Sequence, residues 1–458
     1  MRRSAVRSAA CSVLSPVVPS ADPSLEADVA RAAAPARRAG ARVLGLAALA
    51  MSTALLAACG GGDEQDDGPR RSVGSVRLIG EQTLPNDLQV GGTTVGGLSG
   101  IDYDPAANLW YLVSDDRSDK QPARFYTARI SYDLARLQPV QIASVVTLRQ
   151  ADGSAFPNRT AGGVVPDPEA IRFDSSTGGL WWTSEGDRAL DLDPFVARAR
   201  TDGTLTGTLP LPAAFQMSPT QETGSRNNAT FEGLSLSADG KSLWVSMEGP
   251  LYQDGPLPTP SSGSVSRLLR YDRNGNVLAQ YVYPLDAIPA APAPGRSADN
   301  GVTEILAIDD NRLLTLERAG VQGADGNFTT YVRLYQIDIR GATDVRSLDR
   351  LAGASYVPVR KRLVQNLNAL GLKTVDNIEG MAWGAEAVQR PRQPGARLGQ
   401  QLQREADHAG AGVRGGAGVE GGRRWWHSSA SVSRRQPPSA TVSRRQPPSA
   451  AVSRRQRP

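Results

Sequence analysis

The segment "NATFEGLSLSADGKSLWVSMEG", residues 228–249, contains two short apolar runs separated by a Ser-Ala-Asp-Gly turn. Apolar and polar residues alternate in both runs, and the turn residues favour a tight reversal, so the segment predicts a β-hairpin. A carboxylate stands at each end of this hairpin: Glu232 at the head of the first predicted strand and Glu248 at the end of the second. A core hairpin that begins and ends with a charge needs an explanation.

The same outline recurs along the chain. Units begin at residues 99, 169, 232, 304 and 379, with spacings of 70, 63, 72 and 75 residues. The first three units place polar residues 16 apart, and the fourth places them 13 apart; the pairs are Ser99 and Asp115, Glu169 and Glu185, Glu232 and Glu248, and Glu304 and Glu317. The fifth unit starts at Glu379 and then loses the pattern.

Repeated units built only of strands predict a β-propeller, in which four strands form each blade. Further strand candidates lie between the hairpins, so we expect an all-β, propeller-like fold with five or six blades. The last blade should be incomplete. Sixteen residues after Glu379 the chain has reached Gly395, within the Arg- and Pro-rich stretch "RPRQPGARLGQ".

Charge is distributed unevenly over the 458 residues. Residues 60–384 carry 30 basic and 39 acidic side chains, net −9, whereas residues 1–59 are net +4 and residues 385–458 net +10. Nucleic-acid binding needs clustered Lys and Arg on the folded face. The acidic body therefore argues against a nucleic-acid partner.

Cysteine and histidine are missing from residues 60–384. The two cysteines are Cys11 and Cys59, and the two histidines are His408 and His427. This excludes thiol catalysis, Ser-His-Asp triads and Cys/His zinc sites within the body. Carboxylates, arginines, hydroxyls and any hard metal ion that they bind remain as the available chemistry.

The two ends differ from the body. Residues 37–59, "RRAGARVLGLAALAMSTALLAAC", resemble a bacterial lipoprotein signal in which Cys59 is lipidated; an ordinary secretory signal is the alternative. Residues 1–58 are therefore interpreted as leader and signal peptide, 59–74 as a flexible tether and 75–384 as the propeller domain. We expect an exported lipoprotein of the cell envelope, anchored by lipid to the outer membrane or periplasmic face if the cell is Gram-negative.

Residues 385–458 end in a ten-residue Arg-, Pro- and Ser-rich unit repeated nearly three times. Such a composition cannot build a core and predicts disorder. The tail is interpreted either as a polycationic arm or, preferentially, as a non-native extension.

In a propeller the innermost strands line a central channel, so the acids at the unit ends should converge there. Mutual repulsion would raise their pKa values, and a hard cation such as Ca²⁺ would relieve it. The alternative is that each Glu caps a turn or bonds to the backbone of the neighbouring blade. The predicted metal ligands are Glu169, Glu232, Glu304, Glu379, Asp115, Glu185 and Glu248.

Arginine directly follows a unit-end acid in three units, at Arg117, Arg188 and Arg318. Guanidinium groups bind phosphate oxygens bidentately, so these residues are candidates for substrate binding. A salt bridge across the loop is the alternative for each pair.

Together these motifs resemble the phytase-like family, described as "esterase-like activity of phytase". The resemblance covers roughly residues 76–384 and is carried by GLSGI (97–101), PEA (168–170), FEGL (231–234), WVSME (244–248) and NIEGM (377–381). It implies a propeller with acidic metal sites that hydrolyses a small phosphoester with the help of Ca²⁺. The candidate catalytic residues are then Glu232, Glu169 and Arg318.

Two other functions stay open. One is a non-catalytic propeller that binds a cell-surface partner or glycan. The other is hydrolysis of a lactone or carboxyl ester at the same metal site, because fold alone does not determine function.

Replacing the predicted lipidation site tests the domain organisation. We expect Cys59→Ser to release the protein from membranes into the soluble fraction, because the lipid anchor is lost. Fractionation of expressing cells, followed by immunoblotting, measures this. The matched control, Cys11→Ser, should stay with the membrane; retention of both variants would contradict the lipoprotein prediction.

Overall fold

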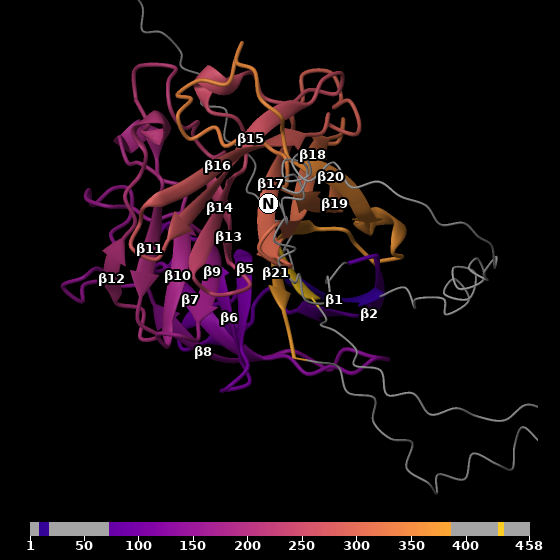
Figure 1. Cartoon of the computed structure of the whole chain (residues 1–458). Coiled ribbons are helices and arrows are strands. Elements are labelled where there is room, and N and C mark those ends of the chain that lie inside the picture. The colour runs from indigo at the N-terminus through magenta and orange to yellow at the C-terminus, as the bar shows by residue number, and fades with distance from the viewer. Residues whose placement is uncertain (1–8, 18–72, 386–428, 435–458) are drawn as a thin grey trace, which may run out of the picture.

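The computed structural model describes residues 9–17, 73–385 and 429–434. It is an all-β propeller, as predicted, with sheets arranged around a common axis (Figure 1). Four blades each consist of four consecutive strands, so the number of blades of this kind is lower than the predicted five or six. Cys59, nearly all of the predicted tether and most of the predicted leader and tail lie outside the described residues.

The strands of the four blades are all paired antiparallel. The first blade comprises β5 (Leu98–Asp104), β6 (Leu109–Ser114), β7 (Arg124–Arg129) and β8 (Gln141–Thr147), and the second β9 (Pro168–Asp174), β10 (Gly179–Ser184), β11 (Phe195–Ala199) and β12 (Leu205–Thr208). The third comprises β13 (Phe231–Leu236), β14 (Ser242–Met247), β15 (Ser264–Asp272) and β16 (Val277–Leu285), and the fourth β17 (Ala298–Ala307), β18 (Arg312–Gln322), β19 (Phe328–Asp338) and β20 (Arg360–Asn366).

A fifth four-stranded sheet has the order β2 (Ser75–Leu84), β1 (Ala9–Val17), β22 (Ser429–Arg434), β21 (Asn377–Trp383). The predicted domain, residues 75–384, supplies only β2 and β21 to this sheet, but β1 and β22 complete it to four strands, so the expected incomplete last blade is not observed. The two strands between them come from the segments interpreted as leader and tail.

The remaining elements are short. Strands β3 (Gln89–Val90) and β4 (Thr93–Thr94) form a small hairpin, and four 3-10 turns lie in loops: η2 (Arg188–Leu190), η3 (Ala213–Phe215), η4 (Tyr252–Asp254) and η5 (Leu367–Ala369).

The hairpin quoted at the outset is β13–β14. Leu234 lies opposite Val245 and Leu236 opposite Leu243, so the alternating apolar residues face each other across the pair. The turn closes because the Gly240 amide donates to the Ser237 carbonyl at 2.8 Å, with Gly240 at φ +69°. Few residues other than glycine adopt that backbone conformation, so the turn fixes the register of the hairpin.

Five apolar clusters fill the spaces between neighbouring sheets. Tryptophans contribute to every one of these clusters: Trp110, Trp181, Trp182 and Trp244 belong to four of them, and Trp383 packs against the fifth. The cluster around Trp110 also includes Ile79 of β2 and Ala382 of β21, so the fifth sheet packs against the first blade. The ring of sheets therefore closes.

The inner strands β5, β9, β13, β17 and β21 touch one another around the axis. In three of the five units a glycine directly follows the first polar residue, and the lack of a side chain there permits this close contact. A Cβ on Gly100 would lie 2.7 Å from the Glu169 carbonyl oxygen, one on Gly233 would lie 2.8 Å from the Ile305 nitrogen, and one on Gly380 would lie 3.0 Å from the Ser99 carbonyl oxygen. Glycine is thus required at these three positions because the backbone of a neighbouring inner strand occupies the space of a Cβ.

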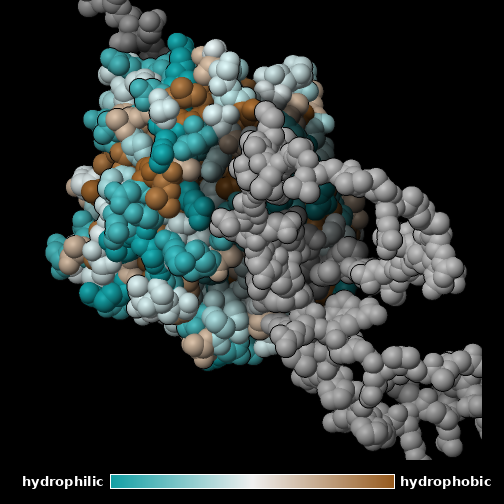
Figure 2. Space-filling view, in the orientation of Figure 1, coloured by the Kyte–Doolittle hydropathy of each residue, from teal (hydrophilic) through white to brown (hydrophobic). Residues whose placement is uncertain are grey.

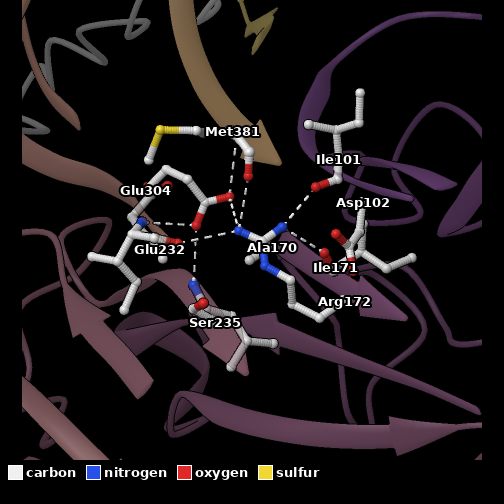
Figure 3. A network of polar contacts seen from close by, with 12 residues as sticks. Ile101, Asp102, Ala170, Ile171, Arg172, Glu232, Ser235, Glu304 and Met381 are labelled. Atoms are coloured by element: carbon white, nitrogen blue, oxygen red, sulfur yellow. Dashed lines mark hydrogen bonds and ion pairs between the residues drawn. The ribbon is translucent and has the colours of Figure 1, made fainter. Parts of the chain in front are cut away.

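Arg172 of β9 lies on this axis, fully surrounded by protein (Figure 3). Its guanidinium donates to the carbonyls of Ile101 in β5 at 2.6 Å and Met381 in β21 at 3.1 Å, and pairs with Glu304 of β17 at 2.5 Å. Glu304 in turn accepts from the Leu234 amide of β13 at 3.2 Å. One buried ion pair therefore connects all five inner strands.

Hydrophilic residues predominate on the face in Figure 2, and the hydrophobic residues there form small separate patches. This matches a core placed between the sheets. Within the described residues, no helix has the length and apolar character needed to cross a membrane.

Replacing Arg172 tests the role of the axial ion pair. Arg172→Met should lower the free energy of unfolding by about 3–5 kcal/mol, because Glu304 stays buried without its partner. Chemical denaturation of the full chain measures the loss. Arg200→Met is the control, since Arg200 is 60% exposed in its 3.2 Å pair with Asp202 and its loss should cost under about 1 kcal/mol. Equal small losses would contradict this role.

Candidate functional site

A β-bulge interrupts each inner strand at, or next to, the first polar residue of the unit. One extra residue is accommodated there relative to the paired strand. The bulges include Ser99 in β5, Glu169 in β9, Glu232 in β13, Thr303 in β17 and Glu379 in β21. A bulge changes the direction of a side chain, which is how a strand that is otherwise core can turn a carboxylate towards a shared site.

Five carboxylates from the second and third blades form a buried group. Ligand atoms of Asp167, Glu169 and Glu185 lie within 4.8 Å of one another, and so do those of Glu185, Glu232 and Glu248. Three members precede or begin an inner strand (Asp167, Glu169 and Glu232), and two follow directly after the second strand of a blade (Glu185 and Glu248). Four of the seven predicted ligands are therefore brought together, and Asp167 is an addition that the repeat pattern missed.

Glu185 belongs to both groups of three and has no exposed surface. Its Oε1 accepts a hydrogen bond from the Thr230 amide at 2.9 Å. Its Oε2 is also buried and has no hydrogen-bond partner among the described residues. An uncompensated buried carboxylate oxygen is costly, so this atom is where a ligand would contribute most.

Arg318 lies at the side of the group nearest Glu248. Its guanidinium donates to Glu248 and Asp299 at 3.0 Å and to Glu379 at 3.3 Å. Burial opposes the charged form, but Asp299, Glu248 and Glu379 outweigh it and raise the pKa of Arg318. The described contacts of this predicted catalytic and phosphate-binding residue are thus to carboxylates.

Arg117 contacts a different member of the group: it pairs with Asp167 and donates to Asn228 at 3.0 Å. Its side chain is 19% exposed, so part of it reaches solvent. Burial lowers its pKa, but the charges of Asp167 and Glu185 outweigh that and the pKa of Arg117 is raised. Of the three arginines predicted to bind substrate, this one lies beside the carboxylate group with solvent access.

The other predicted site residues lie apart from the group of five. Glu304 is bound to Arg172 on the axis, and its pKa is raised to about 7 by burial, against the influence of that arginine. Asp115 packs against Gly97, where a Cβ would clash with the Asp115 Oδ1. Arg188 lies over the Tyr252 ring and donates to the Gln221 carbonyl at 2.7 Å.

Crowding of carboxylates changes the electrostatics of the site. The pKa of Glu248 is raised to about 8, mainly because burial disfavours the charged form; Arg318 opposes this, while Glu185, Asp299 and Glu379 add to it. The Glu248 carboxyl therefore keeps its proton at pH values where isolated carboxylates are ionised.

The fold and this acidic centre define a β-propeller with a carboxylate-lined inner site. The family model for the phytase-like proteins, "Esterase-like activity of phytase", matches residues 93–393, so the chain belongs to that family.

Comparisons with individual proteins are weaker. An "uncharacterized secreted protein" of the fungus Arthroderma benhamiae is 31% identical over 121 residues, which is 24% of this chain and 23% of that protein. A crystal structure titled "putative 6-phosphogluconolactonase", from Bacteroides uniformis, covers 63% of this chain and 92% of its own, at 11% identity and a TM-score of 0.25. A similarity of that size carries no argument about function.

The raised pKa of Glu248 predicts a pH dependence in metal-free protein. Protonated Glu248 stabilises the fold fully below its ordinary pKa of 4.5, and that contribution is lost as the pH rises through about 8. Glu248→Gln cannot ionise, so its stability relative to wild type should increase over this window by up to about 1.4 kcal/mol per pH unit. Denaturant titrations of the full chain in chelator measure this difference.

The control for this measurement is Glu222→Gln, which changes an exposed carboxylate in the loop before β13. Its stability should follow that of the wild type at every pH. A Glu248→Gln profile parallel to wild type would contradict the raised pKa.

Proposed function

We propose that the protein is an exported hydrolase that cleaves a small phosphoester with the help of Ca²⁺ bound by the buried carboxylates. The observation that carries the proposal is the group of Asp167, Glu169, Glu185, Glu232 and Glu248, held within ligand distances beside an arginine that reaches solvent. Membership of a family described by esterase-like activity of phytase supports the reaction class.

The residues fit the cation. Ca²⁺ takes six to eight oxygen ligands and is flexible in geometry, and the group offers carboxylate oxygens without competing nitrogen or sulfur donors. The buried Glu185 Oε2 is an acceptor that a cation would satisfy. When bound, Ca²⁺ polarises a phosphoryl oxygen and lowers the pKa of bound water.

The protein's own residues have separate roles in this proposal. Arg117 binds the phosphate oxygens, because its guanidinium is the positive group beside the carboxylates with solvent access. Glu169 and Glu232 act as ligands, and one of them accepts the proton of the attacking water. Arg318 holds Glu248 and Glu379 in position and offsets their charge.

Export and anchoring complete the proposal. The lipoprotein-like signal ending at Cys59 supports attachment to the cell envelope through lipid, and the partly similar fungal protein is described as secreted. The acidic body supports a bound cation and argues against nucleic acid, while Arg117 supplies positive charge for a small anionic ester.

A panel of phosphomonoesters, phosphodiesters, lactones and carboxyl esters, run with Ca²⁺ and with chelator, separates this proposal from its alternatives. Ca²⁺-dependent release of phosphate supports it. Turnover of lactones or carboxyl esters alone would assign the site to those substrates. No turnover of any compound, together with binding of a glycan or cell-surface partner, would favour a non-catalytic propeller.

Glu232→Gln tests the assigned role directly. We expect kcat/KM for the best phosphoester to fall by roughly 100-fold or more, because Gln neither accepts the proton nor matches the charge of a carboxylate ligand. Glu222→Gln, on the exposed loop, should leave kcat/KM within about twofold of wild type. Equal activity of both variants would remove Glu232 from the site.

A further inference from the structure

The carboxylate group is larger and more negative than one divalent cation requires. Six side chains around it are at least nine-tenths buried: Asp167, Glu169, Glu185, Glu232, Glu248 and Glu379. Two guanidiniums contact this set: that of the buried Arg318 and that of Arg117, whose side chain is 19% exposed. Asp187, also buried, is balanced by Arg159 at 3.0 Å. Six negative charges less two positive charges leave −4, which two divalent cations would neutralise.

The arrangement of the ligands also divides into two halves. Asp167, Glu169 and Glu185 form one group of three, and Glu185, Glu232 and Glu248 form the other. Each half contacts its own arginine: Arg117 pairs with Asp167 of the first, and Arg318 pairs with Glu248 of the second. The two halves thus share Glu185 but differ in the arginine that each contacts.

Glu185 is the residue that the halves share. Its Oε1 is fixed by the Thr230 amide at 2.9 Å, which holds the carboxylate in one orientation, and Oε2 has no hydrogen-bond partner among the described residues. A carboxylate is a common bridge between metal ions, because each oxygen has two lone pairs. Paired metal sites have ions about 3.5–4 Å apart, which a bridging carboxylate can span.

We propose that the site holds two divalent cations bridged by Glu185, the first bound also by Asp167 and Glu169 and the second also by Glu232 and Glu248. This inference rests on the proposed function only for the use of a cation at this site. It adds a stoichiometry, a shared ligand and a separate ligand set for each ion. A paired centre of this kind suits an anion whose two oxygens can face two ions.

The number of bound ions is measured first on the wild-type full chain. The protein is stripped with chelator, and equilibrium dialysis against radioactive Ca²⁺ then counts ions per chain. We expect two. Proximity is measured with Tb³⁺ and Eu³⁺: the Tb³⁺ emission lifetime should shorten when Eu³⁺ occupies the neighbouring position. One ion per chain, or an unchanged lifetime, would overturn the paired centre.

Single substitutions then assign the ligands. Glu169→Gln and Glu248→Gln should each leave one Ca²⁺ per chain, Glu185→Gln should leave none, and the exposed Glu222→Gln should keep two. Circular dichroism and thermal unfolding identify any variant that does not fold. If a variant fails to fold, the number of Ca²⁺ ions bound by the wild-type chain still decides whether the paired centre exists. Loss of only one ion in Glu185→Gln would overturn the bridging role.

The same protein separates the failure of this inference from that of the proposed function. Two Ca²⁺ per chain without hydrolysis of any phosphoester would uphold the paired centre and reject the hydrolase. One Ca²⁺ with Ca²⁺-dependent hydrolysis would reject the pair and uphold the hydrolase. No bound Ca²⁺ would reject both, and protons would then be the charges that stabilise the carboxylates.

Discussion

The guanidinium of Arg172 is the point on which the arrangement of the sheets depends. The N–H groups of a buried arginine need acceptors, and here the two terminal nitrogens donate to carbonyls and a carboxylate of other inner strands. Through Glu304 the network reaches the backbone of β13 as well. Arg172 of β9 thereby fixes the positions of the four other inner strands. Its side chain also fills the axis of the propeller.

This constraint also sets where the acidic site lies. The inner strands approach closely because glycine follows the first polar residue in three of the units. Bulges at the same point turn side chains out of the strand alternation. In the second and third blades they carry Glu169 and Glu232, which meet Glu185 and Glu248 from the ends of the paired strands. The repeat pattern thus combines a glycine that lets the inner strands approach with a carboxylate that the bulge directs to the acidic site.

Sequence patterns alone predicted the hairpins, the propeller and the shared position of the acids, because these depend on alternation and turns within about 20 residues. They did not distinguish Glu304 from Glu169 and Glu232, although all three open a unit. The difference comes from Arg172, which lies two blades earlier in the chain and pairs with Glu304. The residues next to Glu304 in the sequence do not indicate that contact.

Other parts of the site depend on the same kind of distant contact. Arg318 was predicted to bind phosphate, but in the fold it lies among three carboxylates, one of them from a different blade and one from the fifth sheet. Asp167 stands two residues before Glu169, so its place in the group could have been inferred from the period-2 alternation of side chains along a strand. The completion of the fifth sheet by β1 and β22 follows from no pattern near β2 or β21.

The axial position of Arg172 has a consequence for the order of folding. Its acceptors at Ile305 and Met381 lie 133 and 209 residues further along the chain. During synthesis the first three blades can form their local hairpins, but the guanidinium must stay hydrated until the fourth blade and β21 have left the ribosome. Long-range contacts of this kind slow folding. The late-arriving residues around Met381 therefore complete the axis, and partly synthesised chains expose the inner faces that those residues later cover.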